Sequence, residues 1–209
     1  MELTPPEKYT LETYNRSATQ WSSEHSSRNF WREEMRLFQT LLPHGKILEL
    51  GSGWGRDAKE LIDLGYSYVG TDISINLLEM ARKENPGSQF LNQSVYDLNF
   101  PPTTLFDGFW ASAVLLHIPK NRINEALKNI HRFVKEGGIG FISLKQGEGE
   151  VLVNQQKNGW LDRRFFANYT IEEFEQILQK NNFETMKTTT HPMGERVWLC
   201  FFVRVKKQT

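Results

Sequence analysis

Residues that could bind a nucleotide-like ligand stand close together near the start of the chain: Glu49, Gly51, Gly53, Gly55 and, further on, Asp72. Glycines that follow a buried strand allow positive φ and let a ligand approach the backbone closely. A carboxylate about 20 residues later, at the end of the next strand, can accept hydrogen bonds from both hydroxyls of a ribose. The spacing therefore predicts a ligand of the adenosine type.

The positions of the glycines distinguish between adenosine ligands. A dinucleotide site has G-x-G-x-x-G, but Arg56 stands where that last glycine would be. The chain has no G-x-x-x-x-G-K-[ST] run, which excludes a P-loop. Glu49, two residues before Gly51, would repel a pyrophosphate but suits an ammonium or sulfonium ligand. An NAD-dependent oxidoreductase is the main competing interpretation.

The run from Glu49 to Gly55 resembles the class I S-adenosylmethionine-dependent methyltransferases, whose matching motif is an acid followed by G-x-G-x-G. The resemblance implies S-adenosylmethionine as the cofactor and S-adenosylhomocysteine as the product. It also implies methyl transfer to a small molecule by in-line displacement, with O-, N- or S-methylation left open. The cofactor contacts that it implies are Tyr14, Glu49, Gly51, Ser52, Gly53, Gly55, Asp57, Asp72, Ile73, Ser94, Val95, Tyr96 and Ala111.

One departure from the family pattern lies in the turn after the third expected strand. In the family this turn often begins with an acid that binds the adenine amino group. Aligning Asp97-Leu98 with the usual Asp-Leu pair puts Ser94 at the position of that acid. We therefore expect backbone near Val95, with apolar or stacking contact from Tyr96, to hold the adenine. An exposed turn tyrosine is the alternative for Tyr96.

The resemblance gives further side chains a possible role. N-terminal helices in the family lie over the cofactor as a lid, which would bring Tyr14 and Trp21 to the ligand; the alternative is that they only cover one side of the sheet. His117 follows two apolar residues, at a place where some family members have a base and many have a structural histidine. We name His117 as the candidate catalytic residue, needed only where the acceptor must lose a proton.

A connection rich in aromatic and basic residues follows the fifth expected strand. Connections of about twenty residues are uncommon in compact domains and are usually functional or mobile. An arginine there can bind a carboxylate or phosphate in a bidentate way, while aromatics exclude water. We expect a wall on the acceptor side and an acceptor that can be anionic; a surface loop pinned by its aromatics is the alternative. The candidate residues are Trp160, Arg163, Arg164 and Tyr169.

Strand and helix patterns alternate along the chain and predict an α/β fold. Right-handed crossovers give a three-layer sandwich with a mostly parallel seven-stranded sheet, whose last strand is antiparallel. We expect a single domain over 1–209. Its parts are an N-terminal helical lid (1–42), a cofactor-binding core (46–145), an acceptor-side segment (146–169), and a helix with a closing strand hairpin (170–209).

The sequence also predicts where several elements begin and end. Helices are expected over about 4–18 and about 28–42, and a capping box opens the first. Gly137-Gly138 should end the helix before the fifth strand. The turn of the closing hairpin should span 191–195.

Composition argues against several other classes of protein. The 209 residues carry a formal net charge of zero, which gives no reason to expect a nucleic acid or a membrane surface as partner. The one cysteine, Cys200, fits a reducing compartment, so we expect a cytoplasmic protein, monomeric or homodimeric. No residues show metal-ligand spacing, so no metal is predicted. A non-catalytic S-adenosylmethionine-binding partner subunit is a further alternative.

Overall fold

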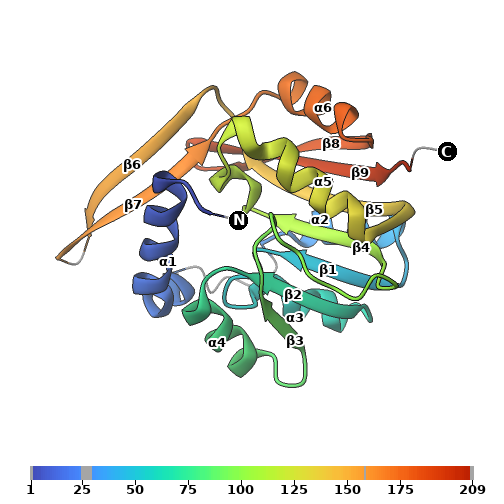
Figure 1. The fold of residues 1–209 in the computed structure, drawn as a ribbon, viewed down its shortest axis with the longest axis horizontal. Coiled ribbons are helices and arrows are strands. Elements are labelled where there is room, and N and C mark those ends of the chain that lie inside the picture. The colour runs from blue at the N-terminus through green and yellow to red at the C-terminus, as the bar shows by residue number, and fades with distance from the viewer. Residues whose placement is uncertain (1, 25–29, 158, 208–209) are drawn as a thin grey trace.

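A computed structural model shows a seven-stranded sheet in the order β3-β2-β1-β4-β5-β9-β8 and a separate sheet of β6 and β7 (Figure 1). The structure describes residues 2–24, 30–157 and 159–207. Strands β1 to β5 pair in parallel, whereas β9 is antiparallel to both β5 and β8. The mostly parallel seven-stranded sheet with an antiparallel last strand is thus confirmed. The strands are β1 (Lys46–Leu50), β2 (Ser67–Asp72), β3 (Gln89–Asn92), β4 (Phe106–Ser112), β5 (Val134–Lys145), β6 (Glu150–Lys157), β7 (Trp160–Ala167), β8 (Phe183–Met193) and β9 (Arg196–Val205).

Helices cover both faces of the large sheet. Met35, Ala58 and Leu78 bring α2, α3 and α4 into one hydrophobic core, and Leu127 and Leu178 bring α5 and α6 into the other. Helix α1 instead lies beside β7 and α4 (Figure 1). The three-layer prediction is confirmed. The helices are α1 (Pro5–Glu24), α2 (Arg32–Leu41), α3 (Arg56–Asp63), α4 (Ile75–Glu84), α5 (Ile123–Phe133) and α6 (Ile171–Lys180), with short 3₁₀ helices η1 (Leu115–His117) and η2 (Lys120–Arg122).

Capping side chains begin three of these helices. The Thr4 backbone N–H and hydroxyl both donate to Glu7 Oε2, at 2.7 and 2.6 Å, which confirms the capping box. Ser74 and Thr170 each accept the backbone N–H three residues further on, at 3.3 and 3.1 Å. These bonds satisfy donors that the first turn of a helix leaves unpaired.

Several predicted boundaries are wrong. Helix α1 continues past residue 18 to Glu24, and its later turns include Trp21, whose ring packs against Tyr14. Helix α2 begins at Arg32 rather than near residue 28, which lies outside the described residues. Gly137-Gly138 does not end α5, which stops at Phe133; the two glycines lie in β5, next to a bulge in its pairing with β4. The closing turn is shorter than 191–195, because β8 pairs with β9 up to Met193.

The segment 146–169 is a strand hairpin, not the loop that was expected. Strands β6 and β7 pair along their full lengths, from Glu150 opposite Ala167 to Lys157 opposite Trp160. The sequence contains Asn158-Gly159 between the two strands, a dipeptide typical of two-residue hairpin turns. Figure 1 shows the hairpin extending from the body beside α1.

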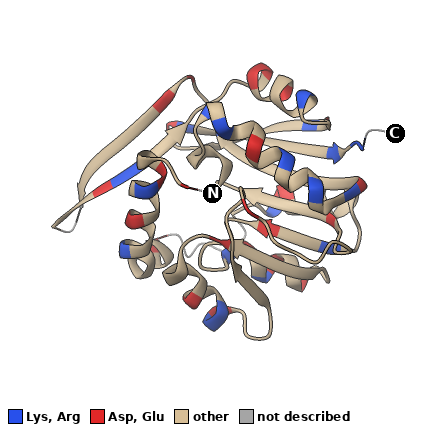
Figure 2. Ribbon diagram, viewed as in Figure 1, with Lys and Arg blue, Asp and Glu red and all other residues tan. Residues whose placement is uncertain are grey.

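Acidic and basic residues alternate over the helices and strands of this fold, without a region of one sign (Figure 2). In the portion of the chain that the structure describes, no helix is long and apolar enough to span a bilayer.

Candidate active site

A cavity lies at the carboxyl ends of β1, β2 and β4 and extends to α1 and η1. Ligands in open parallel sheets bind at this edge, because the loops that follow the strands meet there. The cavity thus joins the glycine turn, the acid after β2 and the N-terminal helix. The predicted site residues that line it are Tyr14, Glu49, Gly51, Ser52, Gly53, Asp57, Asp72, Ile73, Ser94, Val95, Tyr96 and His117.

The turn after β1 depends on a glycine at position 51. Gly51 has φ +65°, and a Cβ there would lie 2.6 Å from the side chain of Val114. The turn then closes with a hydrogen bond from Ser52 N to Thr71 O at 2.9 Å. Glycine is required both for the positive φ and for the close approach of the next loop.

Two backbone N–H groups hold the Asp72 carboxylate in place. Gly53 N donates to Oδ2 at 2.9 Å, and Ser74 N donates to Oδ1 at 2.8 Å. Burial raises the pKa of Asp72, and these backbone donors act in the opposite direction. Each carboxylate oxygen can accept a further bond, so the oriented carboxylate can still bind two ligand hydroxyls.

Glu49 and Asp57 form a buried acidic pair at one side of the cavity. Burial, and next the charge of Asp57, raise the pKa of Glu49 well above its usual value, while the hydroxyl of Tyr68 donates to its carboxylate. Asp57 is better compensated, since Arg56 Nε donates to it at 2.6 Å and Trp110 Nε1 at 3.0 Å. A cationic ligand group beside Glu49 would favour its ionised form.

Two hydroxyls in the cavity have no partner of their own. Ser52 Oγ and Ser112 Oγ are buried, line the cavity and make no hydrogen bond to any described residue. Buried polar atoms are normally paired, so these two suit a polar ligand. The amino acid part of S-adenosylmethionine is such a ligand, and the residues present therefore fit the implied cofactor.

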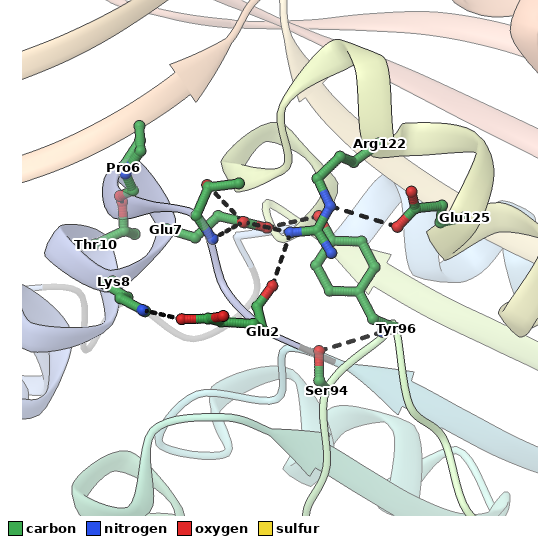
Figure 3. A network of polar contacts seen from close by, with 10 residues as sticks. Glu2, Pro6, Glu7, Lys8, Thr10, Ser94, Tyr96, Arg122 and Glu125 are labelled. Atoms are coloured by element: carbon green, nitrogen blue, oxygen red, sulfur yellow. Dashed lines mark hydrogen bonds and ion pairs between the residues drawn. The ribbon is translucent and has the colours of Figure 1, made fainter.

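The opposite end of the cavity contains a fully paired carboxylate, that of Glu7 (Figure 3). Tyr96 Oη donates to its Oε1 at 2.6 Å, and Arg122 Nη1 donates to its Oε2 at 2.7 Å. The Arg122 guanidinium also lies 4.1 Å from the centre of the Tyr96 ring. Ser94 Oγ accepts the backbone N–H of Tyr96 at 3.2 Å. Tyr96 is buried, so the alternative of an exposed turn tyrosine is wrong.

Side-chain hydrogen bonds attach helix α1 to both neighbours. Thr10 Oγ1 accepts a backbone N–H of β7 at 2.9 Å. Thr13 Oγ1 donates to Arg163 O at 2.9 Å and accepts Arg163 N–H at 3.0 Å. On the other side, Asn15 Oδ1 accepts the hydroxyl of Ser74, at the start of α4, at 2.7 Å. Helix α1 thus joins the hairpin to the cofactor side of the cavity.

Tyr14 and His117 meet in this cavity although they are 103 residues apart in the sequence. His117 Nδ1 lies 2.7 Å from Phe165 O, an acceptor, so Nδ1 carries the proton. In the neutral ring Nε2 then accepts the Tyr14 hydroxyl, at 3.0 Å. Burial lowers the pKa of His117 to about 3, with smaller contributions from Lys145 and Arg164. His117 is therefore a neutral imidazole whose two ring nitrogens are both hydrogen-bonded.

The two predicted arginines of the hairpin point to different surroundings, as adjacent strand residues do. The Arg163 guanidinium lies 3.6 Å from the centre of the Tyr9 ring and 3.8 Å from a Glu12 oxygen. The Arg164 guanidinium lies 4.9 Å from the ring of Trp21, which lines the cavity. Only Arg164 is next to the cavity.

Four other predicted site residues do not line the cavity. Ala111 and Tyr169 are completely buried in the core, because their side chains point into the sheet packing. Gly55 packs against α4, where a side chain would collide with Asn85. Trp160 lies at the start of β7, where its ring is 6.0 Å from the Arg16 guanidinium.

Sequence reasoning missed Glu7 as a cavity residue, whereas Ser112 lies at the end of β4, where a strand of a parallel sheet meets the ligand edge. The capping box identified Glu7 as a local contact, but its bonds to Tyr96 and Arg122 join distant parts of the chain. In 2–24, 30–157 and 159–207, no group of three His, Cys, Asp or Glu residues could hold a metal ion.

Comparison with known proteins identifies the family. The methyltransferase domain family matches residues 48–142. An uncharacterized methyltransferase of Oceanobacillus iheyensis is 26% identical, over 74% of this chain and 75% of that protein. Trans-aconitate 2-methyltransferase of Rhodopseudomonas palustris is 28% identical over 62% of this chain, which spans about half (52%) of that relative.

A solved structure shares the fold over nearly the whole chain. It is the 1,6-didemethyltoxoflavin-N1-methyltransferase of Burkholderia thailandensis with bound 1,6-didemethyltoxoflavin and S-adenosylhomocysteine. The TM-score is 0.77 at 18% identity, over 99% of this chain and 93% of that chain. The prediction is thus confirmed: residues 48–142 match a methyltransferase domain, and the fold is that of class I S-adenosylmethionine-dependent methyltransferases.

Proposed function

We propose that this enzyme transfers the methyl group of S-adenosylmethionine to a small acceptor that carries an anionic group. The observation that carries the proposal is a single cavity that holds both the oriented Asp72 carboxylate and the neutral base His117. The cofactor supplies a methyl group already activated on a sulfonium. The protein then has to align two reactants and exclude water.

The nucleoside part of the cofactor would lie between Asp72 and the turn after β3. Asp72 would accept the two ribose hydroxyls on its free lone pairs. Ser94 Oγ accepts the Tyr96 N–H, and as a neutral hydroxyl it would be a weaker acceptor for the adenine amino group than an ionised acid. The adenine would instead be held by backbone near Val95 and by the ring of Tyr96, whose other face Arg122 covers.

The amino acid part would lie at the other side of the glycine turn. The ammonium group would pair with Glu49, which would ionise Glu49 despite its burial. The unpaired hydroxyls of Ser52 and Ser112 would donate to the carboxylate. Asp57 would act indirectly, because its two oxygens already accept from Arg56 and Trp110.

A proton must leave when the acceptor atom is protonated. The acceptor atom forms a bond to the methyl carbon, the sulfur–carbon bond breaks with its electron pair left on sulfur, and the acceptor proton goes to a base. His117 Nε2 would take that proton through the Tyr14 hydroxyl, while Phe165 O holds the Nδ1–H. An acceptor that is already ionised needs no such step.

Two observations support an anionic acceptor. Arg164 lies beside the cavity residue Trp21 and offers several donors in a fixed plane. The Rhodopseudomonas palustris relative is named for methylation of trans-aconitate, a carboxylate. The remaining expectations, a single domain, a cytoplasmic location and a monomer or homodimer, stay predictions.

A turnover assay of the purified chain with labelled S-adenosylmethionine tests the proposal. The panel should contain carboxylic acids, phosphates, thiols and amines, and we expect methylation of an acid. Cofactor binding without turnover on any acceptor would favour the partner-subunit alternative. Deletion of residues 1–20 tests the lid: the truncated chain should bind S-adenosylhomocysteine more weakly, and equal affinity would leave α1 as a cover only.

A further inference from the structure

Lys145, the last residue of β5, has a charged side chain with no counter-ion. Its Nζ lies 3.2 Å from the centre of the Phe166 ring and makes no hydrogen bond or ion pair with any residue in the described ranges. The charged groups that act on it are Arg164 from β7 and Arg196 from β9, both positive. Lys145 is half-buried, and its ring partner Phe166 packs against the cavity residue His117, so an unpaired ammonium at this place needs an explanation.

The surroundings of Lys145 connect directly with the Tyr14–His117 pair. Four aromatic rings and two cations contact one another in sequence, and they come from η1, the hairpin, α1 and the end of β5. The ring centres are 5.0 Å apart for Phe166 and His117, 5.4 Å for His117 and Tyr14, and 5.2 Å for Tyr14 and Trp21. The Lys145 ammonium lies 3.2 Å from the centre of the Phe166 ring. The Arg164 guanidinium lies 4.9 Å from the centre of the Trp21 ring and 5.7 Å from that of Phe166. The cations therefore lie around one aromatic wall beside the base.

We propose that Lys145 and Arg164 together bind the anionic group of the methyl acceptor. This inference rests on the proposed function and adds Lys145 as a specificity residue that the sequence did not suggest. An anion held between β5 and β7 would place the rest of the acceptor beside His117, toward the cofactor side of the cavity.

The two cations have complementary chemistry for this role. Arg164 Nε donates to Asp162 at 3.2 Å, so one carboxylate already fixes the plane of the guanidinium. Lys145 is a compact charge with three donors and no such partner. Figure 2 shows the basic segment of β7 where the strand runs beside α1. A carboxylate or a phosphate could bridge the two residues, because both anions accept several hydrogen bonds.

Anion binding should depend on pH, because it requires Lys145 to be protonated. Burial lowers the pKa of Lys145 to about 8, and the charges of Arg196 and Arg164 act in the same direction. An anion beside the ammonium raises that pKa, so anion binding and proton binding support each other. The same anion would also offset the two charges that hold the pKa of His117 down.

Titration of the protein saturated with S-adenosylhomocysteine tests the proposal. Sodium acetate and inorganic phosphate are added separately, and the amide NMR signals of Lys145, Phe166 and His117 are followed. We expect saturable shifts with at least one of the anions, and the tighter binder identifies the group that the acceptor carries. Absence of a saturable shift with both anions would overturn the proposal.

Matched variants separate Lys145 from general charge effects. Lys145→Met should weaken anion binding at least tenfold, whereas Lys145→Arg should retain it within about threefold. Lys135→Met removes the same charge from the other end of β5, where Lys135 pairs with Asp107, and should leave anion binding unchanged. Equal anion affinity in the Lys145→Met variant and the wild type would contradict the role of Lys145.

Two further readouts keep the result interpretable. Each variant should bind S-adenosylhomocysteine like the wild type, which shows that it is folded; if the wild type does not bind that product, the proposed function itself fails instead. Raising the pH from 7 to 9.5 should weaken acetate binding about tenfold or more in the wild type but not in Lys145→Arg. Acetate stays ionised above about pH 6, so a pH-independent affinity would count against Lys145.

Discussion

Two charged side chains near opposite ends of the cavity differ in whether the protein supplies a partner of opposite charge. At the adenine end, Glu7 accepts hydrogen bonds from Thr4, Tyr96 and Arg122, and its charge is balanced within the protein. At the proposed acceptor end, the Lys145 ammonium lies over the ring of Phe166 and has no ion pair with any residue that the structure describes. An ion pair within the protein holds two elements together, whereas a charge without a protein partner can bind a ligand of opposite charge.

The difference follows from the task of each end. The adenine end must attach α1 to the body, and the Glu7–Arg122 ion pair joins residues 115 apart in the sequence (Figure 3). In the proposed function, the acceptor end must stay open to an anionic acceptor, and a permanent counter-ion beside Lys145 would compete with it. The predictions below test this contrast, beginning with the largest expected effect.

Replacing the ribose carboxylate should have the largest effect on cofactor binding. Asp72→Ala removes two hydrogen bonds to a charged acceptor, about 1.5–3 kcal/mol each, so the affinity for S-adenosylhomocysteine should fall at least about a hundredfold. Titration calorimetry measures this effect. Asp63→Ala is the control, since Asp63 lies on the exposed side of α3 in a pair with Lys59. Unchanged binding by Asp72→Ala would remove Asp72 from the site.

Breaking the balanced charge should unfold the adenine end. Glu7→Ala removes the acceptor of the Tyr96 hydroxyl and the closer of the two carboxylates that pair with Arg122, so it should cost about 3 kcal/mol in the free energy of unfolding. Urea unfolding followed by circular dichroism gives the value. Glu2→Ala removes an exposed acid that pairs with Lys8, and should have a much smaller effect on the free energy of unfolding. Similar costs for both variants would show that the Glu7 network is not an anchor.

His117 should give a pH-dependent stability instead of an activity limb near pH 6.5. Burial lowers its pKa to about 3, so the folded protein resists its protonation. The unfolded chain binds that proton below about pH 6.5, and stability should fall by up to about 2 kcal/mol between pH 6.5 and pH 5. His117→Gln should lose this part of the pH dependence in urea unfolding. A rate limb near pH 6.5 that disappears in His117→Gln would show instead that His117 titrates normally.

The smallest effect should distinguish the two arginines of the hairpin. Arg164→Met should raise the KM for the acceptor about tenfold without changing cofactor affinity, because its guanidinium lies beside the cavity. Arg163→Met should leave the KM unchanged, since Arg163 packs on Tyr9 at α1. Steady-state kinetics of both variants provide the comparison. A larger effect from Arg163→Met would reverse the assignment.

The sequence by itself determined the cofactor corner and the sheet. The spacing from Glu49 to Asp72 sets a strand, a glycine turn and the end of the next strand, and these are local features of the backbone. The parallel sheet with helices on both faces followed from alternating strand and helix patterns and right-handed crossovers, whereas the order of the strands came from the structure. Hairpin β6–β7 was missed although Asn158-Gly159 is a dipeptide typical of hairpin turns, because the segment was interpreted as one long connection without strands.

Only the tertiary structure decided which side chains share the acceptor end. Tyr14 reaches His117, and Lys145 reaches Phe166, because α1 and the hairpin pack together over the edge of the sheet. No sequence spacing encodes such contacts, since they join residues far apart in the chain through the packing of whole elements. The same packing partly desolvates His117 and Lys145, which lowers the pKa of both side chains and favours their neutral forms.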